Sequence, residues 1–175
     1  MPELVRPHVR YHRSFVAAME EFADEGRTGD HSMVGDDIAR YASTWGTTKG
    51  FAAYVERLLL DETEPRQENF VECSSFFWVE GEEYLGRIAV RHRLNAWLSE
   101  IGGHIGYDVA PSARLRGHGT AMLAAALPKA AELGIDSALI TCSADNTGSR
   151  KIIETNGGKL EDERNGNLRF WVPTS

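Results

Sequence analysis

Residues 101–127 read IGGHIGYDVAPSARLRGHGTAMLAAAL, and this stretch decides the fold. A strand-like run ends at Pro111, a turn with Arg114, Gly117 and Gly119 follows, and a helix-forming run begins behind it. Glycine has no Cβ atom, so the turn can curl until successive N–H groups point inward, where the next helix dipole adds positive charge. The stretch therefore predicts a cradle for a pyrophosphate.

The chain after this stretch continues as an α/β pattern. An apolar stripe predicts a helix over 120–133, bent at Pro128, and a strand over 138–141 follows. Strand, helix and strand are expected to form a right-handed crossover with two parallel strands. Residues 146–156 predict another helix, and residues 159–172 predict a hairpin that turns at Asn165 and Gly166.

The chain before the central stretch changes period part-way. Helical spacing predicts helices over 15–22 and 51–60, joined by a polar loop with a short helix around 36–41. Alternation over 71–79 and 84–90 predicts a hairpin, followed by a helical turn at 94–99 and a strand over 101–109. We find no internal repeat or linker, and therefore expect one domain spanning residues 1–175.

Composition restricts the function classes. The chain has 175 residues, 42% of them hydrophobic, and a formal net charge of -7, so attraction to nucleic acid or to an anionic membrane is not expected. No segment is long and apolar enough for a bilayer, and the N-terminus lacks a secretory signal pattern. Cys73 and Cys142 lie in apolar runs and are expected to be buried thiols. These features predict a cytoplasmic protein.

Two other phosphate-binding classes fit the glycine turn poorly. Met122 stands where the third glycine of a dinucleotide fingerprint would be, and the strand before the turn follows several antiparallel segments. No Walker lysine motif occurs. Glycines at a helix start can also serve the turn alone, so the flanking pattern carries the argument.

The motifs resemble those of the GNAT superfamily of acyltransferases, whose cofactor signature is Gln/Arg-x-x-Gly-x-Gly/Ala. Arg114, Gly117 and Gly119 match that signature. Asn146, Ser149 and the double glycine at 157–158 look like the family's Asn-x-x-Ser/Ala helix and its end, so the resemblance covers residues 70–172. It implies an α/β GNAT fold, with a mixed, mostly antiparallel central sheet flanked by helices and with splayed fourth and fifth strands.

The resemblance also implies acetyl-CoA as co-substrate and no metal. The pantetheine arm is expected to pair with the backbone of the fourth strand, and the pyrophosphate with the glycine turn. The implied cofactor-binding residues are Tyr107, Asp108, Val109, Arg114, Leu115, Arg116, Gly117, His118, Gly119, Thr120 and Asn146. Asn146 suits a helix N-cap equally well.

The catalytic groups are less clear from the sequence. His104 is a candidate base by residue type, although its strand parity differs from that of the family's base positions, so a structural histidine is the alternative. Further acidic candidates are Asp108, Glu72, Glu80 and Glu100. Ile153 stands where the family commonly has its acid tyrosine, which leaves Ser149 or a water for that step.

The predicted activity is transfer of an acetyl group from acetyl-CoA to a primary amine of a small molecule. A protein amine is an alternative acceptor, and a non-catalytic acyl-CoA sensor is an alternative function, suggested by the missing tyrosine. The resemblance also raises a homodimer, because members of the family often dimerise.

Overall fold

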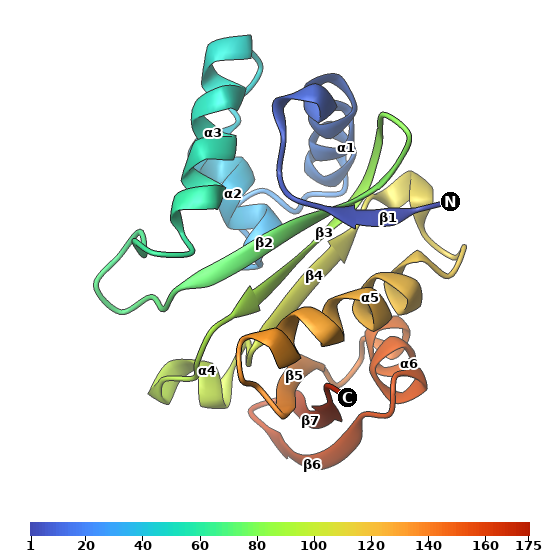
Figure 1. Ribbon diagram of the computed structural model, residues 1–175. Coiled ribbons are helices and arrows are strands. Elements are labelled where there is room, and N and C mark those ends of the chain that lie inside the picture. Colours follow the sequence, from blue (N-terminus) through green and yellow to red (C-terminus); the bar gives the residue numbers. More distant parts are fainter.

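The computed structural model describes residues 1–175. The helices and strands follow one another along the chain in this order: β1 (Glu3–Val5), η1 (Val9–Tyr11), α1 (His12–Asp24), α2 (Met33–Tyr41), α3 (Thr48–Leu60), β2 (Cys73–Glu80), β3 (Glu83–Arg91), α4 (Ala96–Glu100), β4 (Ile105–Val109), η2 (Pro111–Ala113), α5 (His118–Glu132), β5 (Ser137–Ser143), α6 (Thr147–Thr155), β6 (Lys159–Arg164) and β7 (Asn167–Pro173). The elements expected from the sequence are all present (Figure 1).

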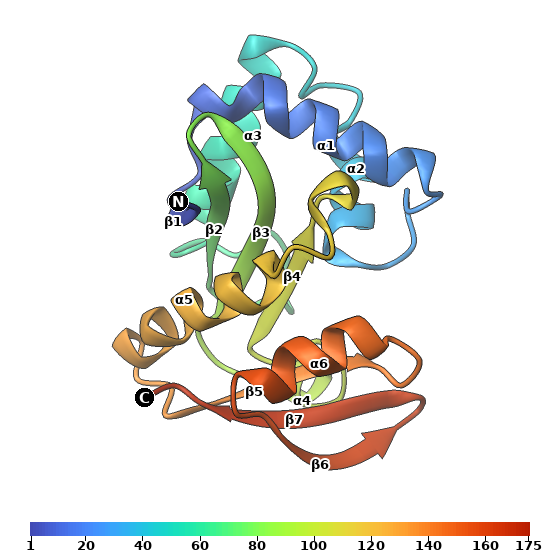
Figure 2. The same ribbon diagram turned by 90° about the vertical axis from the view of Figure 1, so that its right-hand side faces the viewer.

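The strands form two antiparallel sheets. The first has the order β1-β2-β3-β4 and the second the order β5-β7-β6, which confirms both predicted hairpins. Helices α1, α2 and α3 cover one face of the first sheet, and α5 lies on its other face, with α6 beside it (Figures 1 and 2). The α/β architecture with helices flanking mostly antiparallel strands is confirmed.

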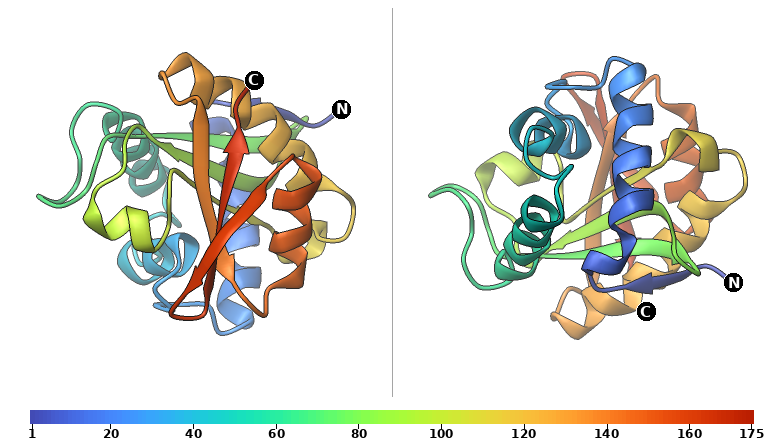
Figure 3. Two further views of the ribbon diagram at one scale, coloured as in Figure 1. Left: turned by 90° about the horizontal axis from the view of Figure 1, so that it is seen from below. Right: turned by 90° about the horizontal axis from the view of Figure 1, so that it is seen from above.

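Strands β4 and β5, the two strands of the predicted crossover, do not form a continuous ladder. They meet at one end, where the His104 N–H donates to the Leu139 carbonyl over 2.7 Å, and belong to different sheets beyond it. Seen from below, the strands of the two sheets cross at a steep angle (Figure 3). The fourth and fifth strands are therefore splayed, as the family resemblance implies.

Several element boundaries differ from the sequence prediction for local reasons. Helices α2 and α3 begin at residues whose preceding Ser32 and Thr47 accept the N–H of Gly35 and Gly50 as N-caps. Strand β4 begins at Ile105 rather than at 101, because Gly102 and Gly103 adopt positive φ angles of 94° and 59°. Helix α5 begins at His118, so Gly119 lies within its first turn.

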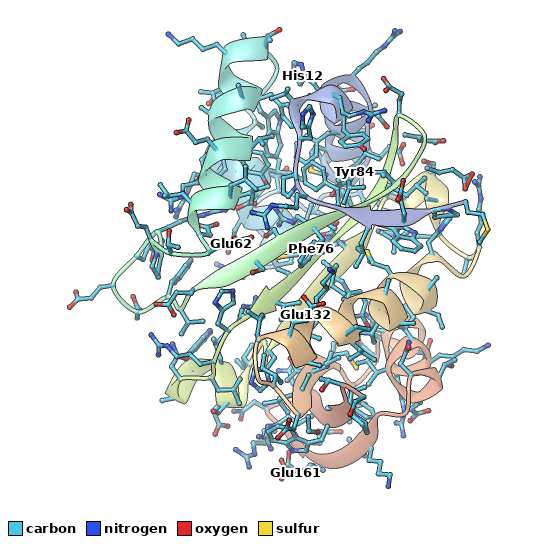
Figure 4. All side chains as sticks on the ribbon, viewed as in Figure 1. His12, Glu62, Phe76, Tyr84, Glu132 and Glu161 are labelled. Atoms are coloured by element: carbon cyan, nitrogen blue, oxygen red, sulfur yellow. The ribbon has the colours of Figure 1, made fainter.

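One core holds the layers together. A cluster of 35 buried residues includes side chains from α1, α3, β2, β3, α5 and β7. Phe15 of α1 contacts the rings of Phe77, Tyr84, Phe51 and Tyr54, and Tyr84 lies between the sheet and α1 (Figure 4).

Both cysteines are free thiols. None of the helices is long and apolar enough to cross a lipid bilayer.

Candidate active site

The splay leaves one backbone edge of β4 unpaired. The Ala110 N–H donates to the Leu85 carbonyl of β3, and the register pairs Tyr107 with Ile88 and Val109 with Gly86. Backbone N–H and C=O groups of consecutive residues point to opposite edges of a strand. Since those of Ala110 face β3, those of Tyr107 and Val109 face away from it. This edge can accept an extended chain as an additional strand.

The turn between η2 and α5 has the backbone geometry of an anion cradle. Leu115 and Gly117 adopt left-handed φ angles of 62° and 81°, and Gly117 is the N-cap of α5 without any side-chain cap. Left-handed residues in such a turn aim neighbouring N–H groups into one concavity, and the first turn of a helix offers unpaired N–H groups. The open space beside Gly117 allows a ligand to approach.

The two arginines of the turn have different surroundings. Arg114 forms a bidentate ion pair with Glu25 at the end of α1, with N···O distances of 2.6 and 3.0 Å. Glu21, one turn earlier, accepts hydrogen bonds from the N–H and hydroxyl of Ser112. Arg116 is exposed and has no ion-pair partner. Arg116 is thus the guanidinium of this turn that is free to meet a phosphate.

The other residues of the turn contact the protein itself. The ring of His118 accepts a hydrogen bond at Nδ1 from the Trp78 indole over 3.1 Å. A Cβ atom on Gly119 would overlap the Cδ1 of Ile152, so this glycine allows α5 and α6 to pack closely. The carbonyl of Thr120 accepts from the Asn156 amide. This half of the turn fixes the position of α5.

A pair of hydroxyl groups lies across the splay. The Tyr107 phenol of β4 and the Ser149 hydroxyl of α6 are 2.6 Å apart. Asn146 accepts the Ser149 N–H at 3.1 Å and is the N-cap of α6. Burial raises the pKa of Tyr107 to about 12, so the phenol stays protonated at neutral pH. The pair brings a transferable proton to the edge where β4 is open.

His104 lies at the point where β4 and β5 meet. It is buried, and its ring Nδ1 accepts the Leu139 N–H over 2.9 Å, while the backbone N–H of His104 donates to the Leu139 carbonyl. Burial and the nearby Arg91 lower the pKa of His104, which keeps the ring neutral and able to accept. One ring nitrogen is therefore engaged in structure, and any role as a base rests on Nε2.

Asp108 lies on the face of β4 opposite to Tyr107. Both of its carboxylate oxygens are inaccessible to solvent and have no hydrogen-bond partner. Burial raises the pKa of Asp108 to about 6, even though Arg87 lies nearby. A buried carboxyl without a donor is unusual in a folded protein and suggests a functional role.

Comparison with known proteins agrees with this geometry. A family model described as the acetyltransferase (GNAT) domain matches residues 22–159. The chain belongs to the GNAT family. As a GNAT protein it is an acetyl-CoA-dependent N-acetyltransferase. No curated protein matches the sequence.

Solved GNAT structures share the fold at low sequence identity. The microcin C7 self-immunity acetyltransferase MccE, solved with acetyl-CoA and AMP, has a TM-score of 0.67 at 12% identity, covering 98% of this chain and 92% of that one. Mycobacterium smegmatis RimJ, solved with a CoA disulfide, has a TM-score of 0.69 at 16% identity, covering 98% and 81%. Campylobacter jejuni PseH, solved with acetyl-CoA, has a TM-score of 0.58 at 14% identity over the full length of both chains.

This GNAT site differs from the sequence expectation in which side chains it brings together. Ile153, at the family's tyrosine position, is fully buried in the core, and the phenol near α6 comes from Tyr107 of β4 instead. The sequence analysis expected only a backbone role for Tyr107, and named Asp108 both as a backbone contact and as one of several acidic candidates. The acidic candidates Glu72 and Glu100 form ion pairs with Arg93 and Arg164 away from the splay, and Glu80 lies near the N-terminus. No local signal identifies the Tyr107–Ser149 pair, since its members are 42 residues apart.

Proposed function

We propose that this GNAT enzyme transfers the acetyl group of acetyl-CoA to a primary amine of a small molecule. The observation that carries the proposal is the Tyr107–Ser149 hydroxyl pair beside the open edge of β4. A thioester acyl transfer needs a donor for the carbonyl oxygen and a proton for the thiolate, and both are available along this edge.

The turn and the open edge fit acetyl-CoA. The N–H groups of residues 115–119 suit the pyrophosphate, and Arg116 adds a free positive charge. The outward N–H and C=O groups of Tyr107 and Val109 suit the amides of the pantetheine arm. When bound, acetyl-CoA supplies the activated acetyl group, and Arg114 and His118 hold the turn through Glu25 and Trp78.

In this proposal Val109 and Ser149 act on the two atoms that gain charge. The outward N–H of Val109 stabilises the carbonyl oxygen, and the Ser149 hydroxyl gives its proton to the departing sulfur. Tyr107 donates to Ser149 in turn and replaces that proton, since a phenol with a pKa of about 12 remains protonated at neutral pH. Asn146 holds Ser149 in place by capping α6.

A small cationic acceptor is supported by charge. The protein carries a formal net charge of -7, and the buried carboxyl of Asp108 has no hydrogen-bond partner, so both favour a cationic amine. A protein amine is the second candidate. RimL, named as a ribosomal L7/L12 alpha-N-protein acetyltransferase, has a TM-score of 0.64 to this chain at 16% identity.

The test follows release of the CoA thiol from acetyl-CoA with a thiol-reactive dye. Spermidine, lysine amide and tyramine represent small primary amines, and short peptides with free N-termini and blocked lysines represent protein substrates. We expect at least one small amine to raise thiol release above that with every peptide. Stimulation by peptides alone would favour the protein-modifying alternative, and acetyl-CoA binding without stimulated release would favour the sensor.

Matched variants test the hydroxyl pair in the same assay. Ser149→Ala should lower kcat about 100-fold, in the range typical of a lost proton donor, while acetyl-CoA still binds. Tyr107→Phe keeps the ring in place and should lower kcat less, because Ser149 can then receive protons from water. An unchanged kcat in Ser149→Ala argues against the assigned donor.

A further inference from the structure

Asp108 faces the layer formed by α1, α2 and α3. Its register partner on β3 is Arg87, and directly opposed residues of an antiparallel pair share a face. Arg87 donates to Asp37 of α2 and Tyr54 of α3, so this face is turned toward those helices. Tyr107, the neighbouring residue, points to α6 on the other side. Consecutive residues of β4 thus present a phenol and a carboxyl on opposite faces of the strand.

The carboxyl of Asp108 is the one buried side-chain group in the protein that lacks a hydrogen-bond partner. Arg87 is its register partner on the same face, but the Arg87 guanidinium donates to Asp37 and Tyr54 instead. Burial of a carboxylate without a donor is costly, and native proteins rarely keep such a group without a ligand or a chemical use. The two oxygens are therefore able to accept N–H donors from a ligand that reaches them.

The charged surroundings of Asp108 leave it able to exchange a proton near neutral pH. The charged groups that act on it are Arg87 of β3, Asp37 of α2, Arg27 after α1 and Arg114 of the turn. Tyr84 of β3 is coupled to it, and Tyr54 of α3 is bound to Asp37 and Arg87 on the same face. Burial raises the pKa of Asp108 most, the arginines lower it and Asp37 raises it, and the result is a pKa of about 6. A base with such a pKa is efficient at neutral pH.

We propose that Asp108 is a catalytic residue that binds the acceptor ammonium group and removes its proton before attack on the thioester. This inference rests on the proposed function, and it assigns the acceptor to the α1–α3 face of β4. The acceptor class is a primary alkyl ammonium, which supplies the N–H donors that the carboxylate lacks.

The protons and bonds balance as follows. The ammonium gives one proton to the Asp108 carboxylate, and the neutral amine forms the new N–C bond with the acetyl carbon. The C–S bond breaks, and the sulfur takes a proton from the Ser149–Tyr107 pair. The nitrogen loses its second proton, which restores that pair through water, and Asp108 releases its proton to solvent before the next cycle.

Asp108→Asn is the decisive variant because it keeps the shape and removes the base. We expect acetyl-CoA affinity to stay within twofold of wild type, kcat/KM for the best amine to fall about 100-fold, and the acidic limb near pH 6 to disappear from the pH profile. Asp36→Asn, at an exposed neighbour of Asp37 on α2, is the control and should behave as wild type. An Asp108→Asn enzyme with wild-type kcat/KM and pH profile would overturn the proposal.

A second measurement separates this inference from the proposed function. The ¹³C signal of the Asp108 carboxyl carbon, assigned with the variant, is titrated in the wild-type protein with and without CoA and spermidine, lysine amide or tyramine. We expect a midpoint near pH 6 that at least one amine lowers, because an ammonium favours the ionised carboxylate. A midpoint that none of the amines moves overturns the role of Asp108, whether or not thiol release is observed. Absent thiol release with a shifted midpoint would instead count against turnover.

Discussion

Burial of Asp108 without a donor destabilises the folded protein whenever the carboxyl is ionised. Its pKa is raised from the ordinary 3.8 to about 6, so between these values the folded state binds a proton that the unfolded state has lost. Stability therefore falls as the pH rises through this window, and the full cost is present above it. Two pKa units correspond to about 3 kcal/mol.

Asp108→Asn is therefore expected to stabilise the protein at pH 7 by up to about 3 kcal/mol and to have almost no effect at pH 3.5. Urea unfolding of wild type and variant at the two pH values measures the difference. A side chain with a purely structural function would give the opposite result, a loss of stability at pH 7. A gain in stability together with a loss of activity is the pattern expected of an active-site residue.

Arg114 and Arg116 lie two residues apart in the turn but are predicted to act differently. Arg116→Ala should weaken CoA binding about tenfold at low salt, the effect of one charge-assisted hydrogen bond, because its guanidinium is unpaired. Arg114→Ala should weaken CoA binding less, because this arginine is already paired with Glu25. Calorimetric titration with CoA at two salt concentrations measures the dissociation constant of each variant. A larger loss for Arg114→Ala would mean that the Glu25 pair opens when CoA binds.

At the scale of elements, the two signature glycines have different duties. Gly117 needs its left-handed φ of 81° but has open space around it, whereas Gly119 lies against Ile152 of α6. One glycine therefore shapes the cradle, and the other sets the distance between α5 and α6.

The two duties are separable by substitution. Gly117→Ala should cost about 1 kcal/mol of backbone strain and should weaken CoA binding by distorting the cradle. Gly119→Ala should cost about 1–3 kcal/mol through overlap with Cδ1 of Ile152. Ile152→Val removes that carbon and should restore most of the stability in the double variant, but should not rescue Gly117→Ala. Denaturant unfolding of the single and double variants measures the free energy of unfolding for each pair. Additive effects of Gly119→Ala and Ile152→Val would contradict the predicted contact.

The junction of β4 and β5 depends on neutral His104. Because the pKa of His104 is lowered in the folded state, the unfolded state binds a proton on this ring below the ordinary 6.5 while the folded state does not. The stability that the neutral ring contributes is therefore complete above pH 6.5 and declines as the pH falls. His104→Ala leaves the Leu139 N–H without its acceptor and should cost about 2 kcal/mol at pH 7.5 and less at pH 5.5. Unfolding at both pH values tests this. Because the proposed base is Asp108, the folded variant should keep a kcat close to that of wild type, and a large loss of kcat would favour His104 as the base instead.

At the scale of the whole molecule, the two sheets share few direct hydrogen bonds. The junction at His104 and Leu139 joins β4 to β5, and α5 and α6 pack against each other beside it. A CoA molecule along the edge of β4 would join the two halves over a longer distance.

CoA at 100 times its dissociation constant should raise the free energy of unfolding by about 2.7 kcal/mol through mass action. Hydrogen exchange should slow in β4, in residues 114–120 and at the start of α6, since these segments line the proposed cofactor site. The β6–β7 hairpin is the internal control and should change little. Protection confined to that hairpin would contradict the assigned cofactor site.

Sequence patterns predicted the elements with good accuracy wherever the cause was local. Period-two alternation identified the β2–β3 hairpin, and Asn165 and Gly166 identified the β6–β7 turn with its left-handed residues. The crossover pattern predicted β4 and β5 as two parallel strands, but it did not show that they meet at one end only, because an apolar strand sequence does not reveal which edge is used.

The sequence by itself determined the strand–turn–helix of residues 101–127, because left-handed glycines and helix starts depend on neighbouring residues. The motif in this stretch also indicated the cofactor class and the family. Only the tertiary structure decided which side chains meet. Arg114 pairs with Glu25 at a separation of 89 residues, and Tyr107 reaches Ser149 across the splay. The carboxyl of Asp108 is buried without a hydrogen-bond partner because of the elements packed around β4, which the local sequence does not show. Burial and partnership depend on packing between distant segments, and no local pattern encodes them.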